Sequence, residues 1–217
     1  MQAVLLDLLM ATMDSMAVWS AAAGDRQRGL EWRDAVTARM LATRAYVPYE
    51  ELVSEEARRL GLPARSTALL FEAWRHMKPW PDAHALAELD VPIGFLTNCS
   101  VHLARLAARR SGLRPRVVLS AEEAGWYKPD RRAYLAACRQ LGSRAGETLY
   151  VAGAAYDAAG ARDAGLRALV GPPPRRHDGA GRRAAGRLAG RGADAPDRLD
   201  GAISGMIGSA RRSATIL

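Results

Sequence analysis

Polar side chains stand at three points where an apolar segment of the sequence ends. They are Asp7, the pair Thr97 and Asn98, and Asp157. Burying an unpaired carboxylate is costly. Asp7 therefore either caps the segment that follows it, or is held at the end of a strand because a reaction requires it there.

The apolar pattern around these points alternates between short strand-like runs and longer helical stretches. We expect strands at 3–7, 91–98, 116–120, 148–153 and 167–171, and helices at 102–112, 130–142 and 157–165. Such alternation is typical of βαβ units and predicts an α/β fold with a doubly wound parallel sheet. Ligands of open parallel sheets bind at the carboxyl ends of the strands, which is where Asp7, Thr97 and Asn98 fall.

A helical insertion is predicted after the first strand. Residues 15–76 show helical spacing of their apolar side chains, and a Pro-containing break follows at 78–81. We therefore expect an α/β core made of residues 1–14 and 81–217, with a small helical cap domain at 15–80.

The formal net charge of +8 raises the question of a nucleic-acid partner. Much of this excess is local, because six arginines and one aspartate stand within residues 175–191. The surrounding segment, 172–195, is rich in Arg, Gly and Ala, a composition that a solvated basic loop explains. We therefore favour a solvated loop over a nucleic-acid partner, and contact of this loop with a phosphate or a nucleic acid stays open as the alternative.

Other bulk features restrict the class of protein. Cys99 and Cys138 show no metal-ligand spacing, which indicates a reducing, cytoplasmic setting. No apolar run approaches the roughly 18 residues of a membrane span, and the N-terminus lacks a signal-peptide pattern. No phosphate-binding Gly-rich motif is present. We expect a protein that uses no cofactor and contacts no membrane.

Four short motifs, in order along nearly the whole chain, resemble those of the haloacid dehalogenase superfamily. Asp7, followed by Asp14, is similar to the first motif, whose leading aspartate is the nucleophile. FLTN with Thr97 resembles the second, YKPDRRAY with Lys128 the third, and VAGAAYDAAGARDAG with Asp157 the fourth. The resemblance implies a doubly wound core with a helical cap, and Asp7, Lys128 and Asp157 as catalytic residues.

Two branches of this superfamily require different residues. Its phosphatases carry a second acid two residues after the nucleophile and a paired acid in the fourth motif that helps to hold magnesium. The corresponding residues here are Leu9 and Gly153. Magnesium demands oxygen ligands in near-ideal geometry, and Asp7 and Asp157 alone would hold it poorly. We expect no metal site, which leaves a magnesium phosphatase as the weakest alternative.

The remaining markers resemble the L-2-haloacid dehalogenases, which need no metal. Arg26 in RQRGLEW resembles their substrate-binding arginine, and Thr12 stands beside their first-motif threonine, whose position is Ala11 here. The residues that the resemblance implies for substrate binding are Arg26, Thr97, Asn98, Thr12, Tyr134 and Tyr156. Simpler roles stay open: Arg26 could lie on a solvated helix face, the two tyrosines could be core aromatics, and Asp157 could cap a helix.

Three alanines depart from that branch. Ala11, Ala152 and Ala154 stand where it carries side chains that hydrogen-bond the nucleophile and the hydrolytic water. Losing one such donor typically costs a factor of roughly 10²–10³ in rate. The departures keep open an alternative in which the chain binds a ligand or partner without turnover.

The resemblance implies a covalent mechanism. Asp7 attacks the carbon that carries the halogen, an ester forms, and water near Asp157 and Lys128 hydrolyses that ester to a 2-hydroxy acid. The charge of Lys128 would offset the repulsion between the two aspartates. The expected ligand is a 2-haloacid or a similar small organic acid, and a homodimer stays open.

Overall fold

The strand that contains Asp7 lies in the middle of a five-stranded parallel sheet. The computed structural model describes residues 1–170, and its strand order is β3-β2-β1-β4-β5. The strands are β1 (Ala3–Asp7), β2 (Ile93–Thr97), β3 (Val117–Ser120), β4 (Thr148–Ala152) and β5 (Arg167–Val170). All residues of β1, β2 and β4 are buried, as expected for parallel strands covered on both faces.

The winding of the sheet reverses between β1 and β4. The connections from β1 to β2 and from β2 to β3 run toward one edge, whereas β4 and β5 lie on the other side of β1. In open α/β sheets, ligands bind at such a switch, outside the carboxyl ends of the strands. Asp7 is the last residue of β1 and therefore lies at this point.

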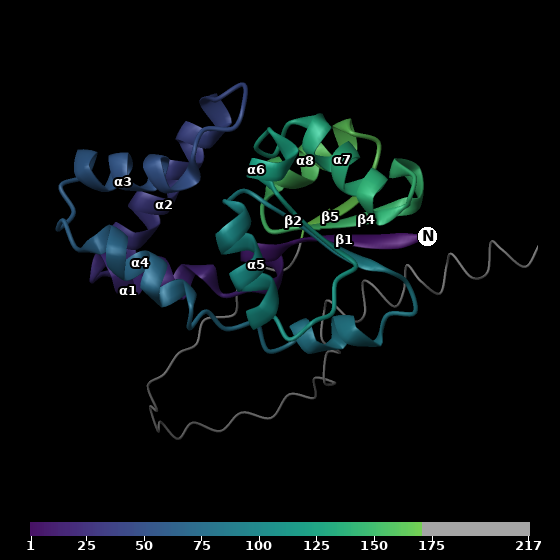
Figure 1. The fold of residues 1–217 in the computed structure, drawn as a ribbon, viewed down its shortest axis with the longest axis horizontal. Helices are drawn as coiled ribbons and strands as arrows, with labels where there is room; N and C mark the ends of the chain where they lie inside the picture. Colours follow the sequence, from purple (N-terminus) through teal and green to yellow (C-terminus); the bar gives the residue numbers. More distant parts are fainter. Residues whose placement is uncertain (171–217) are drawn as a thin grey trace, which may run out of the picture. The chain divides into compact units, whose positions relative to one another are not determined.

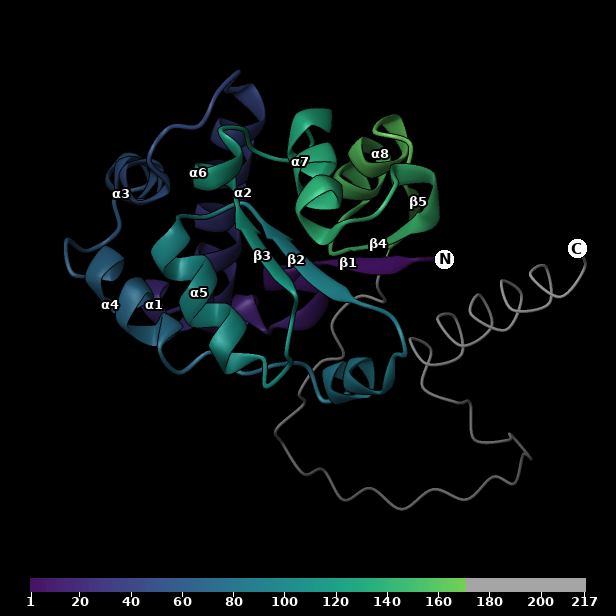
Figure 2. The same cartoon turned by 45° about the vertical axis from the view of Figure 1, so that its right-hand side comes forward.

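Helices cover both faces of the sheet (Figures 1 and 2). One face carries α5 (Val101–Arg110) and η2 (Ala83–Glu88), and the other carries α7 (Arg131–Leu141) and α8 (Ala155–Asp163). Two short helices, α6 (Ala121–Ala124) and η3 (Ala145–Glu147), follow β3 and precede β4. This arrangement agrees with right-handed crossovers between parallel strands.

Four helices form the insertion between β1 and β2, at the left of Figure 1. They are α1 (Ser15–Ala23), α2 (Arg26–Ala42), α3 (Tyr49–Arg59) and α4 (Ser66–Trp74). Met13, just before the insertion, and Pro79, just after it, pair in an isolated antiparallel bridge. The outgoing and returning segments of the insertion therefore lie side by side.

Further hydrogen bonds join the insertion to the core. The Tyr127 hydroxyl donates to the Val47 carbonyl oxygen at 2.6 Å, and the Ser100 hydroxyl donates to the Glu50 carboxylate. These bonds hold the α2–α3 connection and the start of α3 over the carboxyl edge of the sheet. The residues of α1, α2 and α3 can therefore form a wall of any site at that edge.

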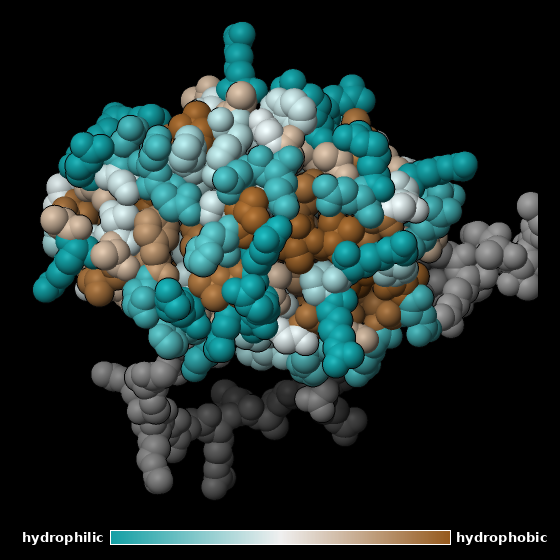
Figure 3. All heavy atoms as spheres, viewed as in Figure 1, coloured by the Kyte–Doolittle hydropathy of each residue, from teal (hydrophilic) through white to brown (hydrophobic). Residues whose placement is uncertain are grey.

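The α/β fold class with a parallel sheet is confirmed, and the helical insertion occupies its predicted place. The division into a core (1–14 and 81–217) and a cap (15–80) stays a prediction, because the described residues form one compact unit. Hydrophilic side chains form most of the outermost atoms in Figure 3. The basic segment at 172–195 lies outside the described residues, and within residues 1–170 no helix has the length and apolarity to cross a bilayer.

Candidate active site

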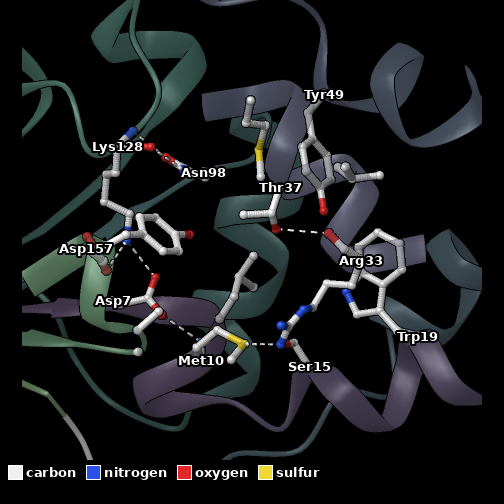
Figure 4. A pocket seen from close by; sticks show the side chains of 16 residues that line it. Asp7, Met10, Ser15, Trp19, Arg33, Thr37, Tyr49, Asn98, Lys128 and Asp157 are labelled. Carbon is white, nitrogen blue, oxygen red and sulfur yellow. Dashed lines mark hydrogen bonds and ion pairs between the residues drawn. The ribbon is translucent and has the colours of Figure 1, made fainter. Parts of the chain in front are cut away.

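Lys128 joins the two predicted catalytic carboxylates. Its ammonium nitrogen lies 2.7 Å from Asp7 Oδ1 and 2.9 Å from Asp157 Oδ2. It also donates to the Tyr150 hydroxyl at 2.7 Å. All four residues are buried, so water screens these interactions little. Residues distant in sequence thus form one charged cluster at the carboxyl edge of the sheet (Figure 4).

Asp7 is also held by the chain that follows it. Residues Leu8–Thr12 form a single π-helical turn, η1, and Asp7 caps it. The second carboxylate oxygen of Asp7, Oδ2, accepts hydrogen bonds from the backbone amides of Met10 at 2.8 Å and Ala11 at 3.2 Å. The sequence left two roles open for Asp7, a helix cap and a site residue. In the structure, Oδ2 caps η1, whereas Oδ1 contacts Lys128.

Gly153 makes room for this carboxylate. A Cβ at Gly153 would lie 2.5 Å from Asp7 Oδ2 and would overlap the side chain of Met10. A larger residue at this position would displace Asp7 or η1. The glycine that stands at the phosphatase acid position is thus required by the packing around Asp7.

Two tyrosines fix Asp157 from behind. Tyr134 donates to Asp157 Oδ1 at 2.6 Å, and Tyr150 donates to Asp157 Oδ2 at 2.8 Å. The two rings meet edge to face, with centroids 5.3 Å apart. α8 begins at Ala155, two residues earlier than expected, so that Asp157 lies inside its first turn and is not the helix cap.

The loop that carries Lys128 is locked by Asn98. The Lys128 amide donates to Asn98 Oδ1 at 2.7 Å, and the Asn98 amide group donates to the Lys128 carbonyl oxygen at 3.0 Å. Gly160 on α8 packs against Pro129, the residue that follows Lys128, because a Cβ at Gly160 would lie 2.7 Å from the Pro129 carbonyl oxygen. Asn98 thus positions Lys128 through its backbone.

For Lys128 and Asp157, burial and the oppositely charged partner shift the pKa in opposite directions. Burial alone would lower the pKa of the Lys128 ammonium, but the carboxylates of Asp157 and Asp7 outweigh it and raise that pKa above its ordinary value. Burial raises the pKa of Asp157, the nearby Asp7 charge adds to this, and Lys128 opposes it. Lys128 therefore stays charged at neutral pH and compensates two carboxylates at once.

A cavity of about 90 Å³ opens beside Asp7. Its core side presents the charged cluster, and its other side is formed by helices α1, α2 and α3 (Figure 4). The lining residues are Asp7, Leu9, Met10, Ser15, Trp19, Arg33, Val36, Thr37, Met40, Tyr49, Asn98, Lys128, Gly153, Ala154, Tyr156 and Asp157. The cavity therefore combines a carboxylate–ammonium floor with a largely apolar wall.

The structure brings some of the predicted binding residues to this cavity and not others. Asn98 and Tyr156 line it, and Tyr134 lies behind it on Asp157. Thr97 is buried with its hydroxyl 3.5 Å from the Cys99 sulfur, and Thr12 donates to the Asp7 carbonyl oxygen at 3.1 Å. Neither threonine is among the residues that line the cavity, and both hydroxyls have partners within the fold.

Arg26, the predicted substrate-binding arginine, also lies away from the cavity. It is the first residue of α2, is exposed, and does not line the cavity. Arg33 lies two turns further along the same helix and does line it. The arginine-rich stretch contains a pocket-facing cation, but sequence spacing alone did not identify which arginine it is.

Sequence reasoning also missed Tyr150. It stands inside TLYVAG, where a continuously apolar strand shows no alternation that would mark one face as polar. A signal was present, because a tyrosine in a fully buried strand needs a partner for its hydroxyl. Lys128 carried a signal too: the sequence contains only one other lysine, Lys78, among 31 basic residues.

The cluster does not fit a magnesium ion. The Lys128 ammonium lies between the carboxylates of Asp7 and Asp157, and the two phosphatase positions, Leu9 and Gly153, supply no side-chain oxygen. Within residues 1–170 no group of three or more His, Cys, Asp or Glu residues could hold a metal ion.

Residues 7–165 match the model of the haloacid dehalogenase-like hydrolase family. This match covers most of the chain, and the chain belongs to that family. The matched segment begins at Asp7 and extends beyond Asp157, so that it includes the whole charged cluster. No curated protein matches the sequence.

Solved structures of L-2-haloacid dehalogenases are similar to this chain. The L-2-haloacid dehalogenase PA0810 is 26% identical with a TM-score of 0.65, covering 84% of this chain and 92% of that one. The L-2-haloacid dehalogenase RSc1362 is 25% identical with a TM-score of 0.66, covering 82% and 91%. The fold is also shared with the Xanthobacter autotrophicus enzyme solved with chloropropionic acid covalently bound, at 23% identity, a TM-score of 0.67, and coverage of 77% and 76%.

Replacing Lys128 tests the cluster through stability. Lys128→Met leaves two buried carboxylates without their cation, which typically costs about 3–5 kcal/mol of unfolding free energy at neutral pH. The matched control is Lys78→Met, at an exposed lysine that also precedes a proline. Denaturant unfolding should show the large loss in Lys128→Met alone.

The same variant has a predicted pH dependence. Without Lys128, the pKa of Asp157 rises further. A carboxyl with a raised pKa in the folded state adds stability below its unfolded pKa and loses it as the pH rises through the folded value. The deficit of Lys128→Met should therefore shrink as the pH falls from neutral. A deficit that is absent, or that does not change with pH, contradicts the assigned charges.

Proposed function

We propose that this hydrolase acts as an L-2-haloacid dehalogenase and needs no metal. Asp7 is its nucleophile, and a 2-haloacid is its substrate. The observation that supports this most strongly is the Lys128 ammonium bound to both Asp7 and Asp157. It supplies the positive charge that a metal would otherwise bring to two adjacent carboxylates.

In the first step, a carboxylate oxygen of Asp7 attacks the carbon that carries the halogen. The new bond is a carbon–oxygen ester bond, and the carbon–halogen bond breaks with its electron pair leaving on the halide. The backbone amides of Met10 and Ala11 and the ammonium of Lys128 hold the carboxylate in one orientation for this displacement.

In the second step, water attacks the carbonyl carbon of the Asp7 ester. The bond from that carbon to the substrate oxygen breaks, and the 2-hydroxy acid leaves after its oxygen takes a proton derived from the water. Asp7 keeps the oxygen of the water, and one proton is released overall. Asp157 and Lys128 lie beside the ester carbonyl position and would orient the water and balance the charge that develops there.

A second candidate function rests on the alanines. Ala154 lines the cavity and occupies the N-cap position of α8 without any side-chain capping bond, so its side chain offers the water no donor or acceptor. In this alternative the cavity binds a small organic acid without turnover. For either function the protein would lie in the cytoplasm, as its free, buried Cys99 and Cys138 suggest, and a homodimer is also open.

Replacing the nucleophile tests the proposal. Asp7→Asn should abolish halide release from 2-bromobutanoate, because an amide oxygen is a poor nucleophile. Asp14→Asn is the matched control: Asp14 caps α1 outside the cavity, and asparagine caps equally well. It should keep the wild-type rate.

Chelation tests the metal independence in the same assay. Halide release by the wild type should be unchanged by EDTA, since no step uses a metal. Activity that disappears with EDTA and returns with magnesium would contradict the proposal and favour the phosphatase.

The pocket alanine generates a kinetic prediction. Because Ala154 cannot orient water, ester hydrolysis should be slower than halide displacement, giving a burst of halide before a slow steady state. Ala154→Asn should raise the steady-state rate up to about 10-fold and add about 1 kcal/mol of stability by capping α8.

The control for Ala154→Asn is Ala155→Asn, one residue further along and exposed outside the cavity. It should change neither the burst nor the steady state. Equal rates in both variants, with no burst in the wild type, would show that Ala154 does not limit hydrolysis.

A further inference from the structure

Arg33 carries a charge that the cluster around Asp7 does not use. Of the charged side chains that line the cavity, Asp7, Lys128 and Asp157 bind one another, which leaves Arg33 on the opposite wall. Figure 4 shows its guanidinium group reaching into the cavity toward the sulfur of Met10.

The contacts of Arg33 divide into an outward set and an inward set. Nε and Nη2 donate to Asp34 Oδ1 at 3.1 Å and 2.6 Å, and the side chain of Asp34 is 62% exposed. Ion pairs exposed to this degree contribute little to the free energy of unfolding. On the inward side, the contacts of Nη1 within residues 1–170 are the sulfurs of Met10 at 3.5 Å and Met16 at 3.7 Å. Thioethers are weak acceptors, so this end of the cation lacks a strong partner among the described residues.

Met10 relates this cation to the nucleophile. Its amide donates to Asp7 Oδ2, and its sulfur contacts Arg33 Nη1. The anion-binding end of Arg33 and the carboxylate of Asp7 are therefore separated by a single residue of η1. A ligand that contacts both needs its anionic group close to its reacting carbon, as in an acid substituted at its 2-position.

The wall around Arg33 has a large apolar part. Trp19, Val36 and Met40 line the cavity on this side, together with hydroxyl-bearing side chains of the same helices. In such surroundings a charge-assisted hydrogen bond is stronger than in water. An arginine also matches a carboxylate with two parallel donors. The same wall can accept an alkyl group attached to the reacting carbon.

We infer that Arg33, and not Arg26, binds the substrate carboxylate, and that the alkyl group of the substrate lies against Trp19, Val36 and Met40. This inference rests on the proposed function, because it assigns the substrate a position relative to Asp7. It concerns anion binding, however, which can be measured without turnover.

The test compares Arg33→Gln with Arg26→Gln, an exposed arginine on the same helix. With 2-bromobutanoate, Arg33→Gln should lower kcat/KM by about 10- to 100-fold, the effect of one charged hydrogen bond. With the neutral 2-bromobutanamide it should match the wild type. Arg26→Gln should match the wild type with both. Equal losses with acid and amide, or a loss in Arg26→Gln alone, overturn the inference.

Calorimetry with unreactive butanoate separates the inference from the proposed function. Butanoate binding that is lost in Arg33→Gln supports the inference even if the wild type releases no halide, in which case the proposed function fails alone. Butanoate binding that Arg33→Gln leaves intact overturns the inference even if halide is released. Bromide binding that depends on Arg33, with butanoate binding unchanged, assigns Arg33 to the leaving group and also overturns it.

Discussion

The site depends on the ion pairs that the buried ammonium of Lys128 forms with Asp7 and Asp157. The ammonium lies within hydrogen-bond distance of Asp7, Asp157 and Tyr150, which come from β1, α8 and β4. Two buried carboxylates repel each other and are costly to desolvate. Without a cation between them, Asp7 at the carboxyl end of β1 and Asp157 in the first turn of α8 could not lie as close together as they do. The meeting of these elements and the chemistry of the site therefore share one constraint.

The packing around the cluster serves this ammonium. Asn98 fixes the backbone of Lys128, Gly153 leaves room for the Asp7 carboxylate, and Tyr150 gives Lys128 a third partner. Lysine suits this position because its ammonium is a compact charge with three donors, whereas the planar guanidinium of arginine would meet three acceptors from one side poorly. In a chain whose basic residues are almost all arginine, this explains a lysine at 128.

The sequence was sufficient for those features that depend on local pattern. The strand ending at Asp7, the insertion that follows it, and the convergence of Asp7, Lys128 and Asp157 all follow from apolar periodicity, ordered motifs and the geometry of a parallel sheet. The roles of single side chains in the cavity did not follow. Arg26 and Arg33 both lie on α2, but of the two it is Arg33 that lines the cavity. The Thr97 hydroxyl, at the end of β2, lies toward the Cys99 sulfur. Tertiary packing decides such orientations, and local sequence does not encode them.

The central claim is that Asp7 forms a covalent ester whose carbonyl carbon is attacked by water. A single turnover in ¹⁸O-water, with enzyme in excess over a 2-haloacid, tests it directly by mass spectrometry of the Asp7 peptide and of the product. The account predicts that the ¹⁸O label enters Asp7 and that the first 2-hydroxy acid released is unlabelled. Label in the product, with none in the Asp7 peptide, would mean that water displaces the halide directly and would contradict the account.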